Sequence, residues 1–226
     1  FGAPVEQPAD GPPTVRKPAY AASVDRTTVR RPDTETSRQL RYLVDSVQAV
    51  VEDQRGTRPV AAPIVAPTDL PALLIGMEAW IEILLFDPES AAFWNRLALE
   101  HFEALAAAYF KAGAAFLVAP VMLANPAVMP RTMTRETIIP LLAEAFSRLP
   151  GPIVFHHGGN RMAHCLEDFT ALPNVAGFAM DEKDSLAIAR RTAGDGRLLL
   201  GNLSGPHFSS RSPADLAERA DRKSVV

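Results

Sequence analysis

The sequence has a single cysteine, Cys165, among its 226 residues. One cysteine cannot form an internal disulfide, which excludes a disulfide-built scaffold and favours a reducing compartment, so we expect a cytoplasmic protein. No apolar run reaches the roughly 20 residues that span a bilayer, and the sequence as given opens with no signal-peptide pattern. We therefore expect no membrane partner.

The sequence also lacks an excess of either charge, with a formal net charge of −3. No cluster of Lys and Arg stands out, so we expect no nucleic-acid partner. No GxGxxG pattern follows any predicted strand, and a dinucleotide-binding fold is therefore not favoured. What is present is apolar: 47% of the residues are hydrophobic, enough to bury a sizeable core.

Both ends of the chain have unusual features. The chain starts at Phe1 with no initiator Met, so we expect a fragment of a longer protein. We interpret residues 221–226 (DRKSVV) as a sequencing artefact and base no prediction of the fold on them. Residues 1–36 are rich in Pro and polar side chains and predict an irregular segment. We expect that segment to belong to the same domain as residues 37–220.

Hydrophobic periodicity predicts a helix over 37–56, one helix over 68–86 and a long helix over 87–113. In the last of these, Asp87 is placed to cap and Pro88 to occupy the first turn. Short apolar runs predict strands, each followed by a helical pattern, at 58–67, 114–120, 151–157, 174–180 and 196–202. The later helices are expected over 134–149, around 161–172, and over 184–194 and 212–220. This alternation predicts an α/β fold with a parallel sheet, either open or closed into an eight-stranded barrel.

Polar or turn-forming residues follow four of the predicted strands. In both architectures ligands bind where parallel strands end at their carboxyl side. The segments selected in this way are 119–125, 156–160, 181–183 and 201–202. We expect the functional site to be built from them.

The stretch IVFHHGGNRMAHC, residues 153–165, is the most suggestive of these segments. His156 and His157 alternate across a strand end, so only one can face a pocket, and we favour His156. Imidazole suits both zinc and substrate contacts. His164 and Cys165 are adjacent and would diverge by about 100° on a helix, so we interpret them as half-buried helix-flank residues.

Two further segments allow two interpretations each. Asp181 and Asp184 fit a helix N-cap, and together with Glu182 they also fit a catalytic carboxylate group. The apolar loop VAPVMLANPAVMP, which includes Met122, fits a wall for a large, partly apolar ligand or a loop packed on a helix.

Five segments in order resemble the uroporphyrinogen decarboxylase superfamily. They are GMEAWIEILLFDPE, YFKAGAAFLVAP, IVFHHGGN, GFAMDEKDSLAIARR and LLLGNLSG. The fourth and fifth are most similar to the corrinoid-dependent methyltransferases of that superfamily, including the methylcobamide:thiol branch. The resemblance implies an incomplete (β/α)8 TIM barrel of parallel strands, truncated at both ends.

The methyltransferase branch carries a His-x-Cys-Gly-Asn motif that supplies two zinc ligands, and a later Cys supplies a third. Here His156 takes the His position and Asn160 ends the Gly-Asn pair, but Gly158 stands where the Cys is expected. The later Cys would lie beyond Val226. Of the three zinc ligands that the resemblance implies, the sequence therefore offers one, His156.

The function implied is transfer of a methyl group between a corrinoid protein, as partner, and a small acceptor such as a thiol. The catalytic candidates are His156 and Glu182, and the substrate-binding candidates are Met122, Asn160 and Asn202. A second interpretation is a metal-free uroporphyrinogen decarboxylase, in which Arg131 and Arg135 would bind acetate side chains. A third is a non-catalytic homologue that binds a corrinoid or tetrapyrrole.

Overall fold

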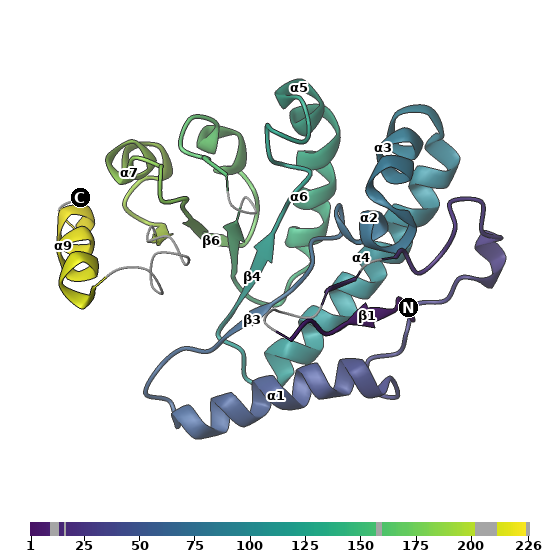
Figure 1. The fold of residues 1–226 in the computed structure, drawn as a ribbon, viewed down its shortest axis with the longest axis horizontal. Helices are drawn as coiled ribbons and strands as arrows, with labels where there is room; N and C mark the ends of the chain where they lie inside the picture. Colours follow the sequence, from purple (N-terminus) through teal and green to yellow (C-terminus); the bar gives the residue numbers. More distant parts are fainter. Residues whose placement is uncertain (10–13, 16, 157–159, 202–211, 225–226) are drawn as a thin grey trace. The chain divides into compact units, whose positions relative to one another are not determined.

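The computed structural model describes the chain except residues 10–13, 16, 157–159, 202–211 and 225–226 (Figure 1). The chain divides into two compact units, residues 1–114 and 115–226. In the described part of the chain, no helix is both long and apolar enough to cross a membrane.

The first unit is mainly helical. Its elements are β1 (Val5–Glu6), β2 (Thr14–Val15), η1 (Arg26–Thr28), α1 (Arg38–Gln54), β3 (Ala61–Pro63), α2 (Leu70–Ile75), α3 (Met77–Phe86) and α4 (Pro88–Lys111). The predicted helices over 37–56 and 87–113 are confirmed as α1 and α4. Ser37 caps α1 and Asp87 caps α4, because each side chain accepts a hydrogen bond from a backbone N–H in the first turn.

The single helix expected over 68–86 is wrong, because the structure has two helices there, α2 and α3. Gly76 separates them with φ 97° and ψ 148°, a conformation that residues with a Cβ rarely adopt. Trp80, in the first turns of α3, is fully buried and donates a hydrogen bond from Nε1 to the carbonyl oxygen of Thr68 (2.8 Å). Because the chain turns at Gly76, the indole of Trp80 in α3 reaches back to Thr68, in the segment before α2.

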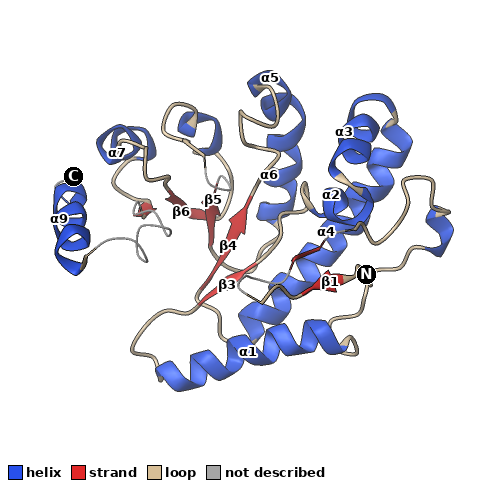
Figure 2. Cartoon of the chain, in the orientation of Figure 1, coloured by secondary structure: helices blue, strands red, loops and turns tan. Residues whose placement is uncertain are grey.

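The second unit contains a parallel sheet in the order β4 (Phe116–Pro120), β5 (Ile153–His156), β6 (Val175–Ala179) and β7 (Leu198–Leu200) (Figure 2). The strands predicted at 114–120, 151–157, 174–180 and 196–202 are confirmed. Their last residues are in register, since Pro120 pairs with His156, His156 with Ala179, and Ala179 with Leu200. The carboxyl ends of the strands therefore form one edge.

Helical segments connect these strands or follow the last of them. They are α5 (Arg131–Met133), η2 (Thr134–Ile138, a π-helix), α6 (Ile139–Ser147), η3 (Leu166–Phe169, a 3-10 helix), α7 (Leu186–Ala193) and α9 (Pro213–Ser224). The helix predicted over 134–149 contains the π turn, in which Ile139 N–H donates to the carbonyl of Thr134. Pro140 has no N–H to donate, and the wider turn just before it is where the helix accommodates that loss.

The helix expected around 161–172 is much shorter in the structure. It is confined to η3, so His164 and Cys165 precede it and our placement of both on a helix is wrong. Cys165 is buried and its thiol donates to the carbonyl oxygen of Met162 (3.5 Å), whereas His164 is exposed. Local turn hydrogen bonds between 162 and 168 replace the helical ones.

An aromatic cluster packs one face of the sheet against η3. Phe155 is fully buried, stacks on Phe169 of η3 at 4.7 Å between ring centroids and meets Phe178 edge-on at 6.3 Å. Because side chains alternate along a strand, the residues that flank Phe155 point to the opposite face. The packing of this ring therefore fixes which way His156 points.

Strands β6 and β7 approach so closely at Gly177 that no side chain fits. A Cβ added there would lie 2.6 Å from the carbonyl oxygen of Leu198. We expect Gly177→Ala to lower the free energy of unfolding by roughly 2–3 kcal/mol, because the two strands must separate to admit the methyl group. Chemical denaturation of the full-length protein measures this loss.

Gly196→Ala is the matched control, since a Cβ there has no neighbour within 4 Å. It should change the unfolding free energy by no more than about 0.5 kcal/mol. Equal effects of the two substitutions would contradict the close approach of β6 and β7.

Candidate active site at the strand ends

The ladder of the sheet continues past the strand ends. Val121 N–H donates to the carbonyl oxygen of His156, and Met180 N–H donates to that of Leu200, each at 2.8 Å. These bonds hold the segments after β4 and β6 against their neighbouring strands. The described residues that follow the strands, at 121–125, 160, 180–184 and 201, are thereby gathered along one edge of the second unit.

His156 is the last residue of β5 and is half-buried. It points away from Phe155, to the face of the sheet opposite η3. Burial lowers the pKa of His156 below 6.5, and the negative charge of nearby Asp181 opposes this shift in part. The imidazole is therefore mainly neutral at pH 7, the form that accepts a proton or coordinates a metal.

Two asparagines join the segments after β4 and β5. Asn160 donates from Nδ2 to Oδ1 of Asn125 (2.8 Å), and the same oxygen accepts the backbone N–H of Ala127 (2.9 Å). Asn125 is only 7% exposed, and its backbone turns the loop through hydrogen bonds with Met122, Val128 and Met129. Asn160, expected from the sequence to bind substrate, is thus held in place by Asn125, which ends the selected segment 119–125 but was given no role of its own.

The carboxylate of Asp184 performs the same function between the segments after β5 and β6. It accepts the backbone N–H groups of Met162, Ala163 and Asp181 at 3.0–3.1 Å. Asp184 and Asp181 were expected to cap the following helix, but the residue that caps α7 is Ser185, whose side chain accepts from Ile188 N–H. The predicted capping role is therefore wrong. Asp184 lies one position before the cap, and its carboxylate accepts instead from the backbone of Met162 and Ala163 in the segment after β5.

The other candidates lie partly within the described residues and partly outside them. Glu182 is half-buried beside Asp181, and Met122 is 40% exposed on the loop after β4. The structure thus brings His156, Asn160, Glu182 and Met122 to one edge, while their roles stay predictions. Asn202, like His157 and Gly158, lies outside the described residues.

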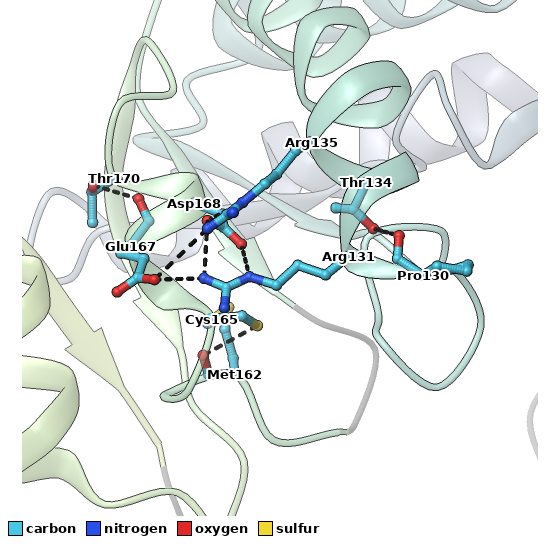
Figure 3. A network of polar contacts seen from close by, with 9 residues as sticks. All are labelled: Pro130, Arg131, Thr134, Arg135, Met162, Cys165, Glu167, Asp168 and Thr170. Carbon is cyan, nitrogen blue, oxygen red and sulfur yellow. Dashed lines mark hydrogen bonds and ion pairs between the residues drawn. The ribbon is translucent and has the colours of Figure 1, made fainter.

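Arg131 and Arg135 are engaged in a network of ion pairs (Figure 3). Arg131 Nε and Arg135 Nη2 each donate to Asp168 at 2.5 Å, and Arg131 Nη2 also binds Glu167 at 2.5 Å. Burial by itself would raise the pKa of Asp168, but the hydrogen bonds from the two arginines hold it below its usual value. The guanidinium groups that could have bound substrate carboxylates are therefore paired within the protein.

Within the described residues, no three His, Cys, Asp or Glu side chains are grouped as metal ligands. Cys165 does not take the place of the expected cysteine, since it is buried and its thiol donates to the carbonyl oxygen of Met162. Burial and the charge of Asp168 also raise the pKa of this thiol to about 11. The described residues thus do not fit the zinc site that the resemblance implies.

The model of the uroporphyrinogen decarboxylase (URO-D) family matches residues 1–223. The chain belongs to the uroporphyrinogen decarboxylase family. Membership agrees with the family resemblance of the strand-end motifs, and the members of this family are enzymes.

Two solved structures resemble this family member. A methyltransferase from Methanosarcina mazei superposes with a TM-score of 0.79 at 18% identity, over 91% of this chain and 60% of its own. A putative vitamin-B12 independent methionine synthase from Listeria monocytogenes superposes with a TM-score of 0.52 at 15% identity, over 79% of this chain and 57% of its own. The chain thus spans about 60% of the length of the methyltransferase. No curated protein matches the sequence.

At these identities the likeness concerns the fold. The α/β architecture with parallel strands is that of a partial TIM barrel, and the predicted fold class is confirmed.

The ion-pair network gives a pH-dependent prediction. Asp168 is 4% exposed at its side chain and its partners are partly exposed, so Asp168→Asn should lower the free energy of unfolding by about 2 kcal/mol at pH 7. Because the folded pKa of Asp168 lies below the unfolded value of about 3.9, this contribution is complete above that value. It is lost as the pH falls through the folded pKa.

Denaturation of wild type and variant between pH 7 and pH 2 measures the difference. The control is Glu144→Gln, which removes an exposed pair with Arg148 and should cost no more than about 0.5 kcal/mol. A wild-type advantage over Asp168→Asn that stays constant down to pH 2 would contradict the assignment.

Proposed function

We propose that the protein transfers a methyl group between a corrinoid carried by a partner protein and a small acceptor such as a thiol. The observation that supports this most is a half-buried, mainly neutral histidine at a strand end, in a family member whose fold is shared with a methyltransferase. The likeness supports the class of reaction, and the strand-end residues support the role of each group.

The reaction requires a nucleophile at the acceptor. A thiol must lose its proton, because the thiolate is the form that attacks a methyl group. The new S–CH3 bond forms as the Co–CH3 bond breaks, and the electron pair of the broken bond stays on cobalt. In this proposal His156 accepts the thiol proton, since its imidazole is mainly neutral at pH 7.

The remaining candidates have supporting roles in the proposal. Asn160, fixed by its bond to Asn125, contacts the acceptor, and Glu182 provides a second polar group at the same edge. Met122 offers an exposed apolar surface for the corrinoid side of the reaction. Asn202 is included from the sequence alone.

The decarboxylase interpretation is less well supported. A substrate with several carboxylates needs cationic partners, and the two arginines proposed for this purpose, Arg131 and Arg135, are bonded to Asp168 and Glu167. Using them would require breaking these ion pairs first. The non-catalytic interpretation differs in lacking turnover, so it is distinguished by corrinoid binding without reaction of either substrate.

The experiment supplies full-length protein with methylcobalamin and a thiol and follows the corrinoid spectrum. We expect wild type to demethylate the corrinoid, and His156→Gln to reduce kcat/KM by roughly 100-fold, within the range for loss of a general base. His164→Gln is the matched control, because His164 is exposed. It should behave as wild type.

Other outcomes favour the other interpretations. Release of CO2 from uroporphyrinogen, with no demethylation of the corrinoid, would favour the decarboxylase. Corrinoid binding without turnover of either substrate would favour the non-catalytic homologue. Full methyl-transfer activity in His156→Gln would contradict the role given to His156.

A further inference from the structure

Asp184 connects two segments that are distant in the sequence. Its carboxylate Oδ1 accepts from Met162 N (3.1 Å) and Ala163 N (3.0 Å), and its Oδ2 accepts from Met162 N (3.0 Å) and Asp181 N (3.1 Å). Met162 and Ala163 lie 22 and 21 residues earlier in the chain. The side chain thus binds the segment after β5 and the segment after β6 at once.

The helix that follows does not require this arrangement. Ser185 caps α7, so the carboxylate of Asp184 is not needed to satisfy the first turn. Asp184 is 9% exposed, and a buried carboxylate is costly unless hydrogen bonds satisfy it. Here backbone N–H groups satisfy it, and bonds of this kind to a charged acceptor are about twice as strong as neutral ones.

The groups that Asp184 holds are next to the site residues. Met162 and Ala163 follow Asn160, whose amide reaches Asn125, and Asp181 precedes Glu182. A shift of the carboxylate would therefore move the segments after β5 and β6 together.

We propose that Asp184 is a positioning residue that sets the relative place of Asn160 and Glu182 through its backbone hydrogen bonds to Met162, Ala163 and Asp181. The inference rests on the proposed function only for the chemistry that the site performs. The contact itself is a property of the fold. Asp184 acts through the two segments whose backbone N–H groups its carboxylate binds.

Binding both segments at once requires two acceptor oxygens on one short side chain. The amide introduced by Asp184→Asn would offer one carbonyl oxygen and would turn an NH2 group toward the remaining N–H donors. One of the two segments would then lose its acceptor. The substitution preserves side-chain size and removes only the second acceptor and the charge.

The test compares Asp184→Asn with Asp195→Asn in the full-length protein, because Asp195 is exposed and outside the strand-end edge. Hydrogen exchange is measured at the backbone amides of Met162, Ala163 and Asp181, together with the NMR signal of the side-chain amide of Asn160. We expect at least tenfold faster exchange in one of the two segments, at Ala163 or at Asp181, in Asp184→Asn only, with loss of the distinct Asn160 signal when the segment after β5 is the one released. Wild-type exchange at all three backbone amides in that variant overturns the proposal.

Kinetics separate positioning from a purely structural role. Where wild type transfers methyl groups, folded Asp184→Asn should lose at least tenfold in kcat, with KM for the thiol within threefold of wild type. An unchanged kcat despite faster exchange in either segment overturns the proposal. If wild type transfers no methyl group, the proposed function fails, and the NMR signals alone decide whether Asp184 positions the two segments.

A measurement on wild type covers the case in which Asp184→Asn does not fold. If one carboxylate holds both segments, the amides of Met162, Ala163 and Asp181 open together, and low denaturant accelerates their exchange with one common dependence. Different denaturant dependences for Asp181 and the other two amides overturn the proposal.

Discussion

The candidate site depends on one buried carboxylate. Asp184 joins the segments after β5 and β6 beyond the point where the pairing of the two strands ends. Loops at strand ends carry function in α/β proteins, but their backbone polar groups need partners as much as those of helices do. In this family member a side chain, rather than further secondary structure, provides those partners. Asn125 likewise links the segments after β4 and β5, since its Oδ1 accepts from the backbone N–H of Ala127 and from the side chain of Asn160.

Periodicity and composition predicted most of the fold. The strands ending at Pro120, His156 and Ala179 were found because short apolar runs between turn-forming residues have few other structural solutions. The break at Gly76 was missed, since a glycine inside a strongly apolar helical pattern is often tolerated and only its backbone angles show the interruption. The π turn before Pro140 was missed for a similar reason.

The site was predictable only in part. His156 was selected because a polar residue at the end of a buried strand must face the ligand-binding edge. Asp184 was given a capping role, because the sequence cannot reveal that Met162 and Ala163, over 20 residues away, need an acceptor. Arg131 and Arg135 looked available for substrate for the same reason, as their partners on η3 are more than 30 residues away in the sequence. Local patterns identify donors and acceptors, whereas their pairing depends on the tertiary fold.

The stacking of Phe155 on Phe169 limits how β5 can change by insertion or deletion. Deleting one residue from Ile153–Val154 would exchange the two faces of β5, provided that the strand kept its pairing with its neighbours. The imidazole of His156 would then face η3, and the ring of Phe155 would face the candidate site. Only changes of two residues would keep both side chains in place. We therefore expect relatives of this protein to differ in length after the strands far more readily than within β5.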